Sequence, residues 1–152
     1  MVKKTVTYTD YNGEEVTKDF YFNLTKMEFN ELDENIPGGL QNLIDKLLTE
    51  KDKGLTVKLL SILLLAAYGE KVDGRFVKED AYGRKLSNYF KVSEAWDVLF
   101  MNLVKNDREM GEFLVGIVPK DMAEDAKKAI ENPEEAIKTQ LTALPKSDMP
   151  TA

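Results

Sequence analysis

The chain of 152 residues contains no cysteine and no histidine. Without cysteine it can form neither a disulfide framework nor a thiolate zinc site. Without histidine it lacks the commonest transition-metal ligand and the commonest general base. Proline is scarce and there is a single tryptophan. We therefore expect no metal site, no cofactor and no catalytic residues, in a protein that binds a partner and is not an enzyme.

Long apolar runs and basic stripes are also missing. The longest apolar stretch, from Leu59 to Tyr68, is interrupted by Ser61 and is too short to cross a bilayer. The first ten residues lack the apolar core of a signal peptide. The net charge is −6 and Lys and Arg do not cluster, which disfavours nucleic acid and anionic lipid as partners. We expect a soluble cytoplasmic protein that binds neither nucleic acid nor membrane.

Residues 5–22 predict a β-hairpin, because β-branched and aromatic residues flank Asn12-Gly13. A two-residue Asn-Gly loop would divide the apolar side chains between both faces. A three-residue loop, with Gly13 left-handed in a G1 bulge, collects them on one face. We favour the second register, because an isolated hairpin is marginal and needs an apolar face to pack on helices. That face carries Val6, Tyr8, Val16, Phe20 and Phe22.

After the hairpin, the apolar period becomes helical. A capping box at Thr25 and Glu28 opens the first helix, and Pro37-Gly38-Gly39 follows it. The amphipathic stripe of residues 40–48 predicts a second helix. The fold class we expect is α+β, mostly α: an N-terminal β-hairpin packed on a bundle of about five to six short helices.

The central buried helix is predicted at residues 55–68, with Gly69 as its left-handed C′ residue. A weaker helix carries Tyr82, Leu86, Tyr89 and Phe90 on one face. The last two helices are predicted after caps at Ser93 and Asp107, and Pro119 ends the second of them.

Residues 120–152 differ in composition, with no aromatic residue and three of the five prolines. Asn132-Pro133-Glu134-Glu135 nevertheless has the cap and the first turn of a helix, and predicts a short amphipathic helix at 133–143. We divide the chain into a folded domain, residues 1–119, and a polar C-terminal tail, residues 120–152. The tail either frays while it helps to cover the domain, or docks as a helix in the groove of a partner.

The stretch GEKVDGRF, residues 69–76, has the glycine spacing of a phosphate-binding loop. Such a loop needs G-x-x-x-x-G-K-[ST] between a strand and a helix, whereas Arg75 and Phe76 replace the last two positions and the stretch follows a helix. An EF-hand loop also fails, because Asp73 is the one carboxylate at the required positions. The stretch therefore predicts a tight turn at Asp73-Gly74 between short extended segments.

Three stretches together resemble the tail assembly chaperones of long-tailed bacteriophages and prophages: TVTYTDYNGEEVTKDFYFNLTKMEF, AAYGEKVDGRFVK and FLVGIVP. The most distinctive element is Tyr68-Gly69 followed by Asp73-Gly74-Arg75-Phe76. The family implies a protein that binds the tape-measure protein in the host cytoplasm and keeps it soluble while tail-tube subunits polymerise around it. It also implies absence from the mature virion and, in many members, a longer frameshifted form that recruits tail-tube protein.

The partner site is predicted only in outline. A chaperone for amphipathic helices should offer an apolar groove with a charged rim, which we place on the last two helices of the domain and the tail helix. The candidate partner-binding residues are Met101, Met110, Ile130, Ile137, Leu141 and Leu144. Methionine suits adaptable surfaces, although both of these methionines could instead fill the core. The residues assigned to structural turns are Asn12, Gly13, Gly69, Asp73 and Gly74.

Two further expectations follow from this picture. One is self-association of the chain. The other is an alternative function, a structural tail or head–tail connector subunit that stays in the virion and forms closed rings.

Overall fold

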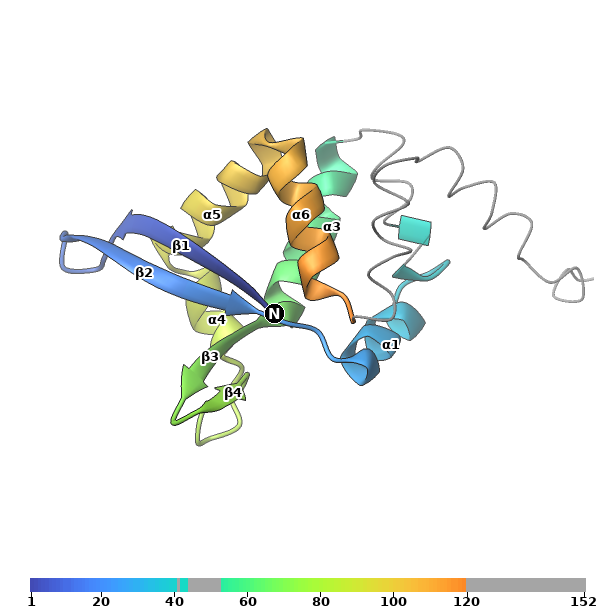
Figure 1. Ribbon diagram of the computed structural model, residues 1–152, viewed down its shortest axis with the longest axis horizontal. Coiled ribbons are helices and arrows are strands. Elements are labelled where there is room, and N and C mark those ends of the chain that lie inside the picture. Colours follow the sequence, from blue (N-terminus) through green and yellow to red (C-terminus); the bar gives the residue numbers. More distant parts are fainter. Residues whose placement is uncertain (41, 44–52, 120–152) are drawn as a thin grey trace, which may run out of the picture.

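The computed structural model describes residues 1–40, 42–43 and 53–119. The described part has an α+β fold, in which four strands form one antiparallel sheet of order β1-β2-β3-β4 (Figure 1). The elements in chain order are β1 (Val2–Thr9), β2 (Glu15–Phe22), α1 (Lys26–Asn35), α3 (Lys53–Ala67), β3 (Tyr68–Val72), β4 (Arg75–Val77), α4 (Leu86–Lys91), α5 (Glu94–Lys105) and α6 (Asp107–Ile117). The sheet contains a second hairpin, β3–β4, at the tight turn that the sequence predicts between short extended segments, although the expected fold class included only the N-terminal hairpin.

Two predicted helices fall wholly or mainly outside this part of the chain. The tail helix at 133–143 lies outside the described residues, and so does most of the helix at 40–48. Among the helices that the structure describes, none combines the length and the apolar character needed to cross a membrane.

The first hairpin has the predicted register. Thr9 pairs with Glu15, and the numbers of paired residues sum to 24 along the whole ladder. Gly13 has a φ of 79° and donates its N–H to the Asp10 carbonyl at 3.0 Å, as a three-residue loop with a G1 bulge requires. The apolar face is thereby turned toward the helices, and Phe22 is completely buried.

The second hairpin turns at the predicted Asp73-Gly74. Val72 pairs with Arg75, and the two loop residues have φ values of 49° and 77°. Two left-handed residues in succession are the signature of a type I′ turn, whose twist matches that of the flanking strands.

The prediction for Gly69 is wrong. Helix α3 ends at Ala67, and Gly69 belongs to β3 without a left-handed φ. A Cβ atom built on Gly69 would lie 2.4 Å from Cζ of Phe76, across the hairpin. Glycine is therefore required at this position because the Phe76 ring occupies the space of a side chain, and not because a helix ends there.

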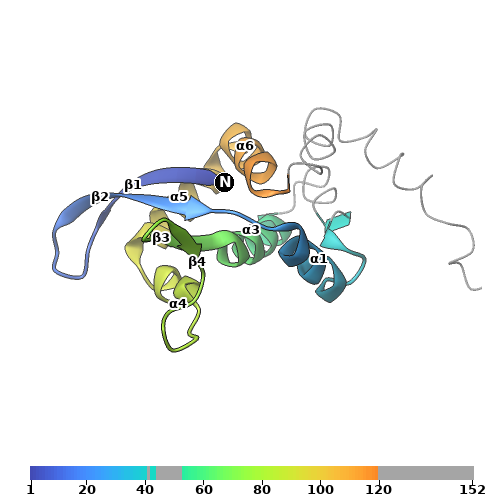
Figure 2. The same cartoon turned by 60° about the horizontal axis from the view of Figure 1, so that its bottom comes forward.

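Aromatic rings join the sheet to the helices. Tyr68 at the start of β3 stacks on Phe90 of α4, with ring centroids 4.3 Å apart and planes at 11°. Phe22 meets Phe113 of α6 edge to face at 5.3 Å. Strand β1 packs against α5, and the far half of the β1–β2 hairpin extends beyond the helices as an arm (Figures 1 and 2).

Two local helix predictions need correction. The N-cap of α6 is Asn106, whose side chain accepts from the Glu109 N–H at 3.1 Å, so the predicted cap Asp107 is the first helical residue. Tyr82 lies in the loop before α4 and is 82% exposed, because Asp80 folds that loop and the helix starts only at Leu86.

Candidate functional site

The predicted partner-binding residues do not come together in the described structure. Met101 on α5 is 48% exposed, whereas Met110 on α6 is 5% exposed and belongs to the core. Met110 shares the inward face of α6 with other buried residues, namely Phe113, Leu114 and Ile117. It therefore fills the core, which was the alternative considered for it. The other four candidates, Ile130, Ile137, Leu141 and Leu144, lie outside the described residues.

A different surface has the character expected of a partner site. It is a cavity of about 530 Å³ between α1, α3 and α4, which we call the α1–α3–α4 groove. Its volume falls within the usual range of ligand-binding pockets. The groove is lined by Glu28, Glu31, Leu32, Asn35, Ile62, Leu65, Ala66, Tyr68, Lys78, Glu79, Lys85, Ser87 and Asn88.

The apolar floor of the groove comes mainly from α3. This helix is apolar nearly all round, and its buried leucines, among them Leu63 and Leu64, face the core. Ile62 and Leu65 lie beside them on the helix and are only half-buried. Leu32 of α1 adds a third apolar side chain from the facing helix. The groove thus retains apolar surface that the described part of the chain leaves partly uncovered.

Lys78 connects the segments that surround the groove. Its ammonium group donates to the carbonyls of Asn23 and Ala66, both at 2.8 Å, and to Oε2 of Glu28 at 2.6 Å. An ammonium group has three N–H donors, so all of them are used. The Ala66 carbonyl belongs to the last turn of α3, where the helix dipole favours a positive charge.

The other end of this connection is the capping box of α1. The Thr25 side chain accepts from the Glu28 N–H at 3.2 Å, and Oε1 of Glu28 accepts from the Thr25 N–H at 3.0 Å. Burial raises the pKa of the Glu28 carboxyl, but the bonds from Lys78 and Thr25 and the Lys78 charge together lower it below 4.5. Glu28 therefore stays ionised near neutral pH while it both caps the helix and pairs with Lys78.

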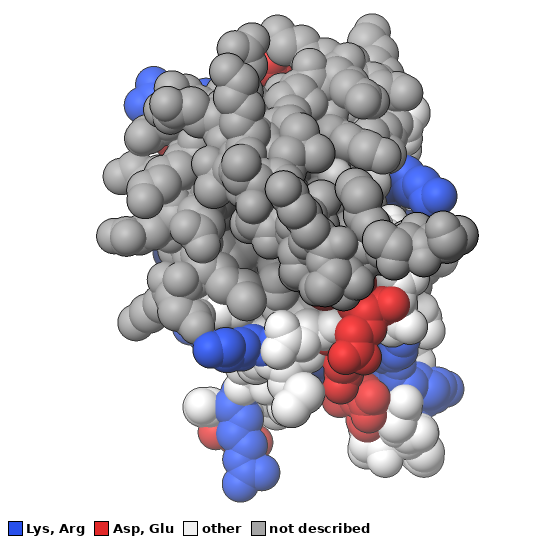
Figure 3. Space-filling view, turned by 90° about the vertical axis from the view of Figure 1, so that its right-hand side faces the viewer, with Lys and Arg blue, Asp and Glu red and all other residues white. Residues whose placement is uncertain are grey.

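The rim of the groove is charged. The charges of Glu28 and Lys78 cancel in their ion pair. The other charged side chains that line the groove are Glu31, Glu79 and Lys85. Helix α1 carries four acidic residues against one basic residue, and acidic side chains gather on the side of the molecule where α1 lies (Figure 3). The α1 wall is thus acidic, which favours a basic partner segment.

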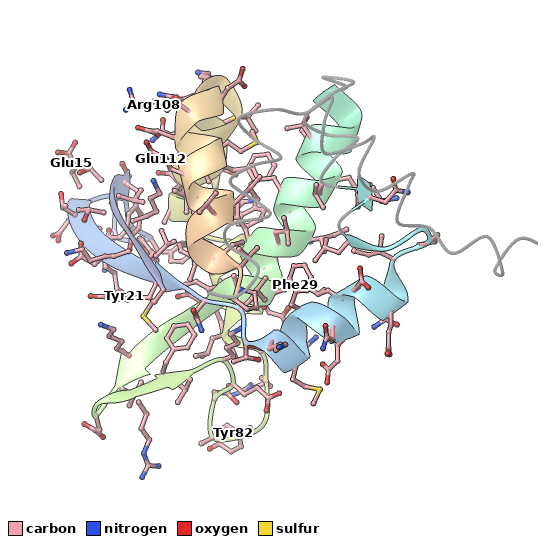
Figure 4. All side chains as sticks on the ribbon, turned by 45° about the vertical axis from the view of Figure 1, so that its right-hand side comes forward. Glu15, Tyr21, Phe29, Tyr82, Arg108 and Glu112 are labelled. Carbon is pink, nitrogen blue, oxygen red and sulfur yellow. The ribbon has the colours of Figure 1, made fainter. Side chains whose placement is uncertain are left out.

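The opposite wall depends on a loop that Asp80 organises. Its Oδ1 accepts from the N–H groups of Tyr82 and Arg84, both at 2.9 Å, and Arg84 Nε donates to its Oδ2 at 2.9 Å. These bonds, the Arg84 N–H first among them, lower the pKa of Asp80. The loop places Tyr82 at its outer end, away from the helices (Figure 4), and holds Glu79 and Lys85 together in a β-bridge beside the groove.

Sequence reasoning missed this groove, although one part of it had a signal. The acceptors of Lys78 lie between 12 and 55 residues away along the chain, so no local pattern indicates its role. The floor did have a signal, because a helix that is apolar all round has more apolar faces than one contact with a core covers.

A second cavity, of about 610 Å³, lies beside β3–β4 and is lined in part by Glu70, Asp73, Glu79 and Asp80. Among the residues that the structure describes, no group of three or more His, Cys, Asp or Glu side chains is arranged to hold a metal ion.

Comparison with known proteins identifies a family for the chain but does not bear on the groove. A protein-family model described as phage tail assembly chaperone matches residues 1–152 of the chain. No curated protein and no solved structure gives a match. Since the family match covers the whole sequence, the chain belongs to the phage tail assembly chaperone family.

Proposed function

We propose that the chain binds the tape-measure protein of its phage, its client, and keeps this long helical protein soluble during tail assembly. A client helix docks in the α1–α3–α4 groove. Membership of the tail assembly chaperone family supports the general role. The observation that carries the location is the groove itself, with apolar side chains from two helices in its floor and charged side chains on its rim.

The chemistry of the groove suits an amphipathic helix. Apolar side chains of the client would bury the exposed parts of Ile62 and Leu65, while basic side chains would approach Glu31 on the α1 wall. The net charge of −6 adds a long-range attraction for a basic client and limits aggregation of the free chaperone. The proposal requires no catalysis and no cofactor.

The same proposal includes three features of assembly. The protein acts in the host cytoplasm and is absent from the mature virion, a longer frameshifted form recruits tail-tube protein, and copies of the chain associate with one another. A slippery heptanucleotide near the 3′ end of the gene, overlapping a downstream frame, would support the frameshift.

Co-expression with the tape-measure protein tests the function. We expect the client to remain soluble after centrifugation and to co-elute with the chain in size-exclusion chromatography. A client that pellets in the presence of folded chaperone contradicts the proposal.

Matched variants test the location. Leu65→Glu and Glu31→Lys alter the floor and the rim of the groove, whereas Met101→Glu alters the exposed methionine of α5. We expect the two groove variants to lose client binding and Met101→Glu to retain it, with circular dichroism confirming that all three are folded. The opposite result would return the client site to α5.

The alternative, a structural tail or head–tail connector subunit, makes a different prediction. Mass spectrometry of purified virions should detect a connector and should not detect an assembly chaperone.

A further inference from the structure

The outer edge of strand β1 is open. β1 is the first strand of the sheet, and within the described part of the chain no other strand pairs with its outer side. Helix α6 lies beside the beginning of this edge, where Gly116 approaches Val2. Toward the turn, the edge leads into the arm that extends from the helices (Figure 2).

The hydrogen-bond pattern shows which backbone groups are available on this edge. The Asp10 N–H donates to the Glu14 carbonyl at 2.8 Å. The even-numbered residues of β1 therefore direct their backbone N–H and C=O groups toward β2. The odd-numbered residues then point their N–H and C=O groups outward. β2 shows the same alternation on its other side: the N–H of the odd-numbered Asn23, just after β2, points away from β1 and donates to the Ala67 carbonyl at 2.9 Å. The residues of β1 whose backbone groups point outward are Lys3, Thr5, Thr7 and Thr9.

The charges along the arm are arranged in two groups. Lys3 and Lys4 lie near the start of β1, whereas Asp10, Glu14 and Glu15 lie at the turn. A second copy that pairs antiparallel with this edge would bring each basic group beside the acidic turn of the other copy. The edge is therefore complementary to itself in both hydrogen bonding and charge.

We propose that two copies of the chain associate through antiparallel pairing of their β1 edges, about a two-fold axis at Thr7, to form one continuous sheet. In this register Thr7 faces the partner's Thr7, and Lys4 faces the partner's Asp10. α6 approaches β1 at Val2 and α5 packs against the strand, but no described strand pairs with the outward backbone groups of residues 3–9. The self-association belongs to the proposed function, but it does not involve the α1–α3–α4 groove, so either can fail without the other.

The β2 edge is a poorer candidate for the same role. Its odd-numbered residues Glu15, Thr17 and Asp19 also point outward, but β3 pairs with Tyr21 and Phe22 and ends the free stretch. Two of the three free positions carry carboxylates, so an antiparallel copy would place acidic residues near acidic residues.

A pair of proline variants separates the two edges. Thr7 and Thr17 are register partners, both N–H groups point outward, and their hydroxyl groups share one hydrogen bond of 2.8 Å. Thr7→Pro and Thr17→Pro therefore lose the same side-chain bond and no bond of the β1–β2 ladder, but they block opposite edges.

Sedimentation velocity of the full-length chain alone, over concentrations on the order of 1–100 µM, measures the association. We expect a concentration-dependent species of twice the 17.3 kDa chain mass. Thr7→Pro should raise the dimer Kd about tenfold or more, and Thr17→Pro should leave it unchanged. A wild-type chain that remains monomeric, or a dimer weakened more by Thr17→Pro than by Thr7→Pro, overturns the proposal.

Two further measurements cover the case in which a proline variant does not fold. Lys4→Glu should weaken the dimer more than Lys18→Glu, which changes the net charge equally but lies on β2. Hydrogen exchange of the wild-type chain should slow at residues 3–9 as the concentration rises. Slowing at these residues only after addition of the tape-measure protein would show that a client strand occupies the edge, and the dimer would be wrong.

Discussion

The two hairpins of the sheet begin from similar turn chemistry and end in different environments. Both turn at a left-handed glycine, Gly13 in the first and Gly74 in the second. A Cβ atom added to either glycine would meet nothing within 4 Å. The first turn is nevertheless tied to the rest of the domain through Tyr11, whose hydroxyl donates to the Val92 carbonyl at 2.8 Å. The hairpins differ in what their strands contact. β1–β2 enters the core at its base and extends outward as an arm, whereas β3–β4 is short and lies beside the groove.

The difference shows that a turn sequence determines a hairpin but not its function. The arm has a long outer edge along which no other described strand pairs. The short hairpin is followed at once by Lys78, whose three hydrogen bonds tie it to α1 and α3. One hairpin therefore offers a surface for pairing, and the other supports the wall of a groove.

The largest expected effect is at the base of the arm. Phe22→Ala removes a fully buried ring that contacts Tyr68, Phe90 and Phe113, and should lower the free energy of unfolding by about 3–5 kcal/mol. Tyr21→Ala, on the partly exposed opposite face, should cost about 1 kcal/mol or less. Urea denaturation measures both. Equal losses would mean that the arm is not anchored through its apolar face.

The next effect is at the groove. Lys78→Met should lower the free energy of unfolding by about 2 kcal/mol, because two backbone carbonyls and the Glu28 carboxylate lose their donor. Lys71→Met is the control, since Lys71 is exposed and lies over the Tyr21 ring at 4.4 Å. A Lys78→Met chain as stable as the control would show that the three hydrogen bonds of Lys78 contribute little to the free energy of unfolding.

The Glu28–Lys78 pair also predicts a pH dependence. The pKa of Glu28 is lowered on folding, so its contribution to stability is fully present above the ordinary value of 4.5 and is lost as the pH falls through the lowered pKa. Denaturation of wild type and Lys78→Met from about pH 7 to about pH 3 should show a smaller acid-side loss in the variant. Parallel curves would assign the acid sensitivity to other carboxylates.

A smaller effect is expected at the distinctive motif of the second hairpin. Gly69→Ala should cost about 1–2 kcal/mol, because the new Cβ displaces the half-buried Phe76 ring. In a Phe76→Ala background the same substitution should cost much less, and a double-mutant cycle measures this coupling. Additive losses would mean that Gly69 is required for its backbone and not for the ring.

Local chemistry explains what was predictable. The apolar alternation of the first hairpin admits one register that collects its side chains on one face, and Thr25 and Glu28 make the predicted capping box. The errors arose where a residue serves a contact that is distant in sequence. Gly69 was assigned to a helix end because a glycine after an apolar helix is typical of one, whereas the Phe76 ring requires it.

The site was less predictable than the fold. The preference of methionine for binding surfaces led to Met101 and Met110, but the rotation of α5 and α6 on the core leaves Met101 of α5 outside and buries Met110 of α6. No periodicity specifies that rotation to within one side chain. The groove floor instead consists of α3 residues whose exposure depends on which neighbours cover them.

The sequence by itself determined the α+β class, the turns at Gly13 and at Asp73-Gly74, and the resemblance to tail assembly chaperones, because each depends on residues close together in the chain. Only the tertiary structure decided which apolar residues remain partly exposed, where Lys78 finds its acceptors and which strand edge is open. These features depend on packing between segments many residues apart, and local propensity does not specify that packing.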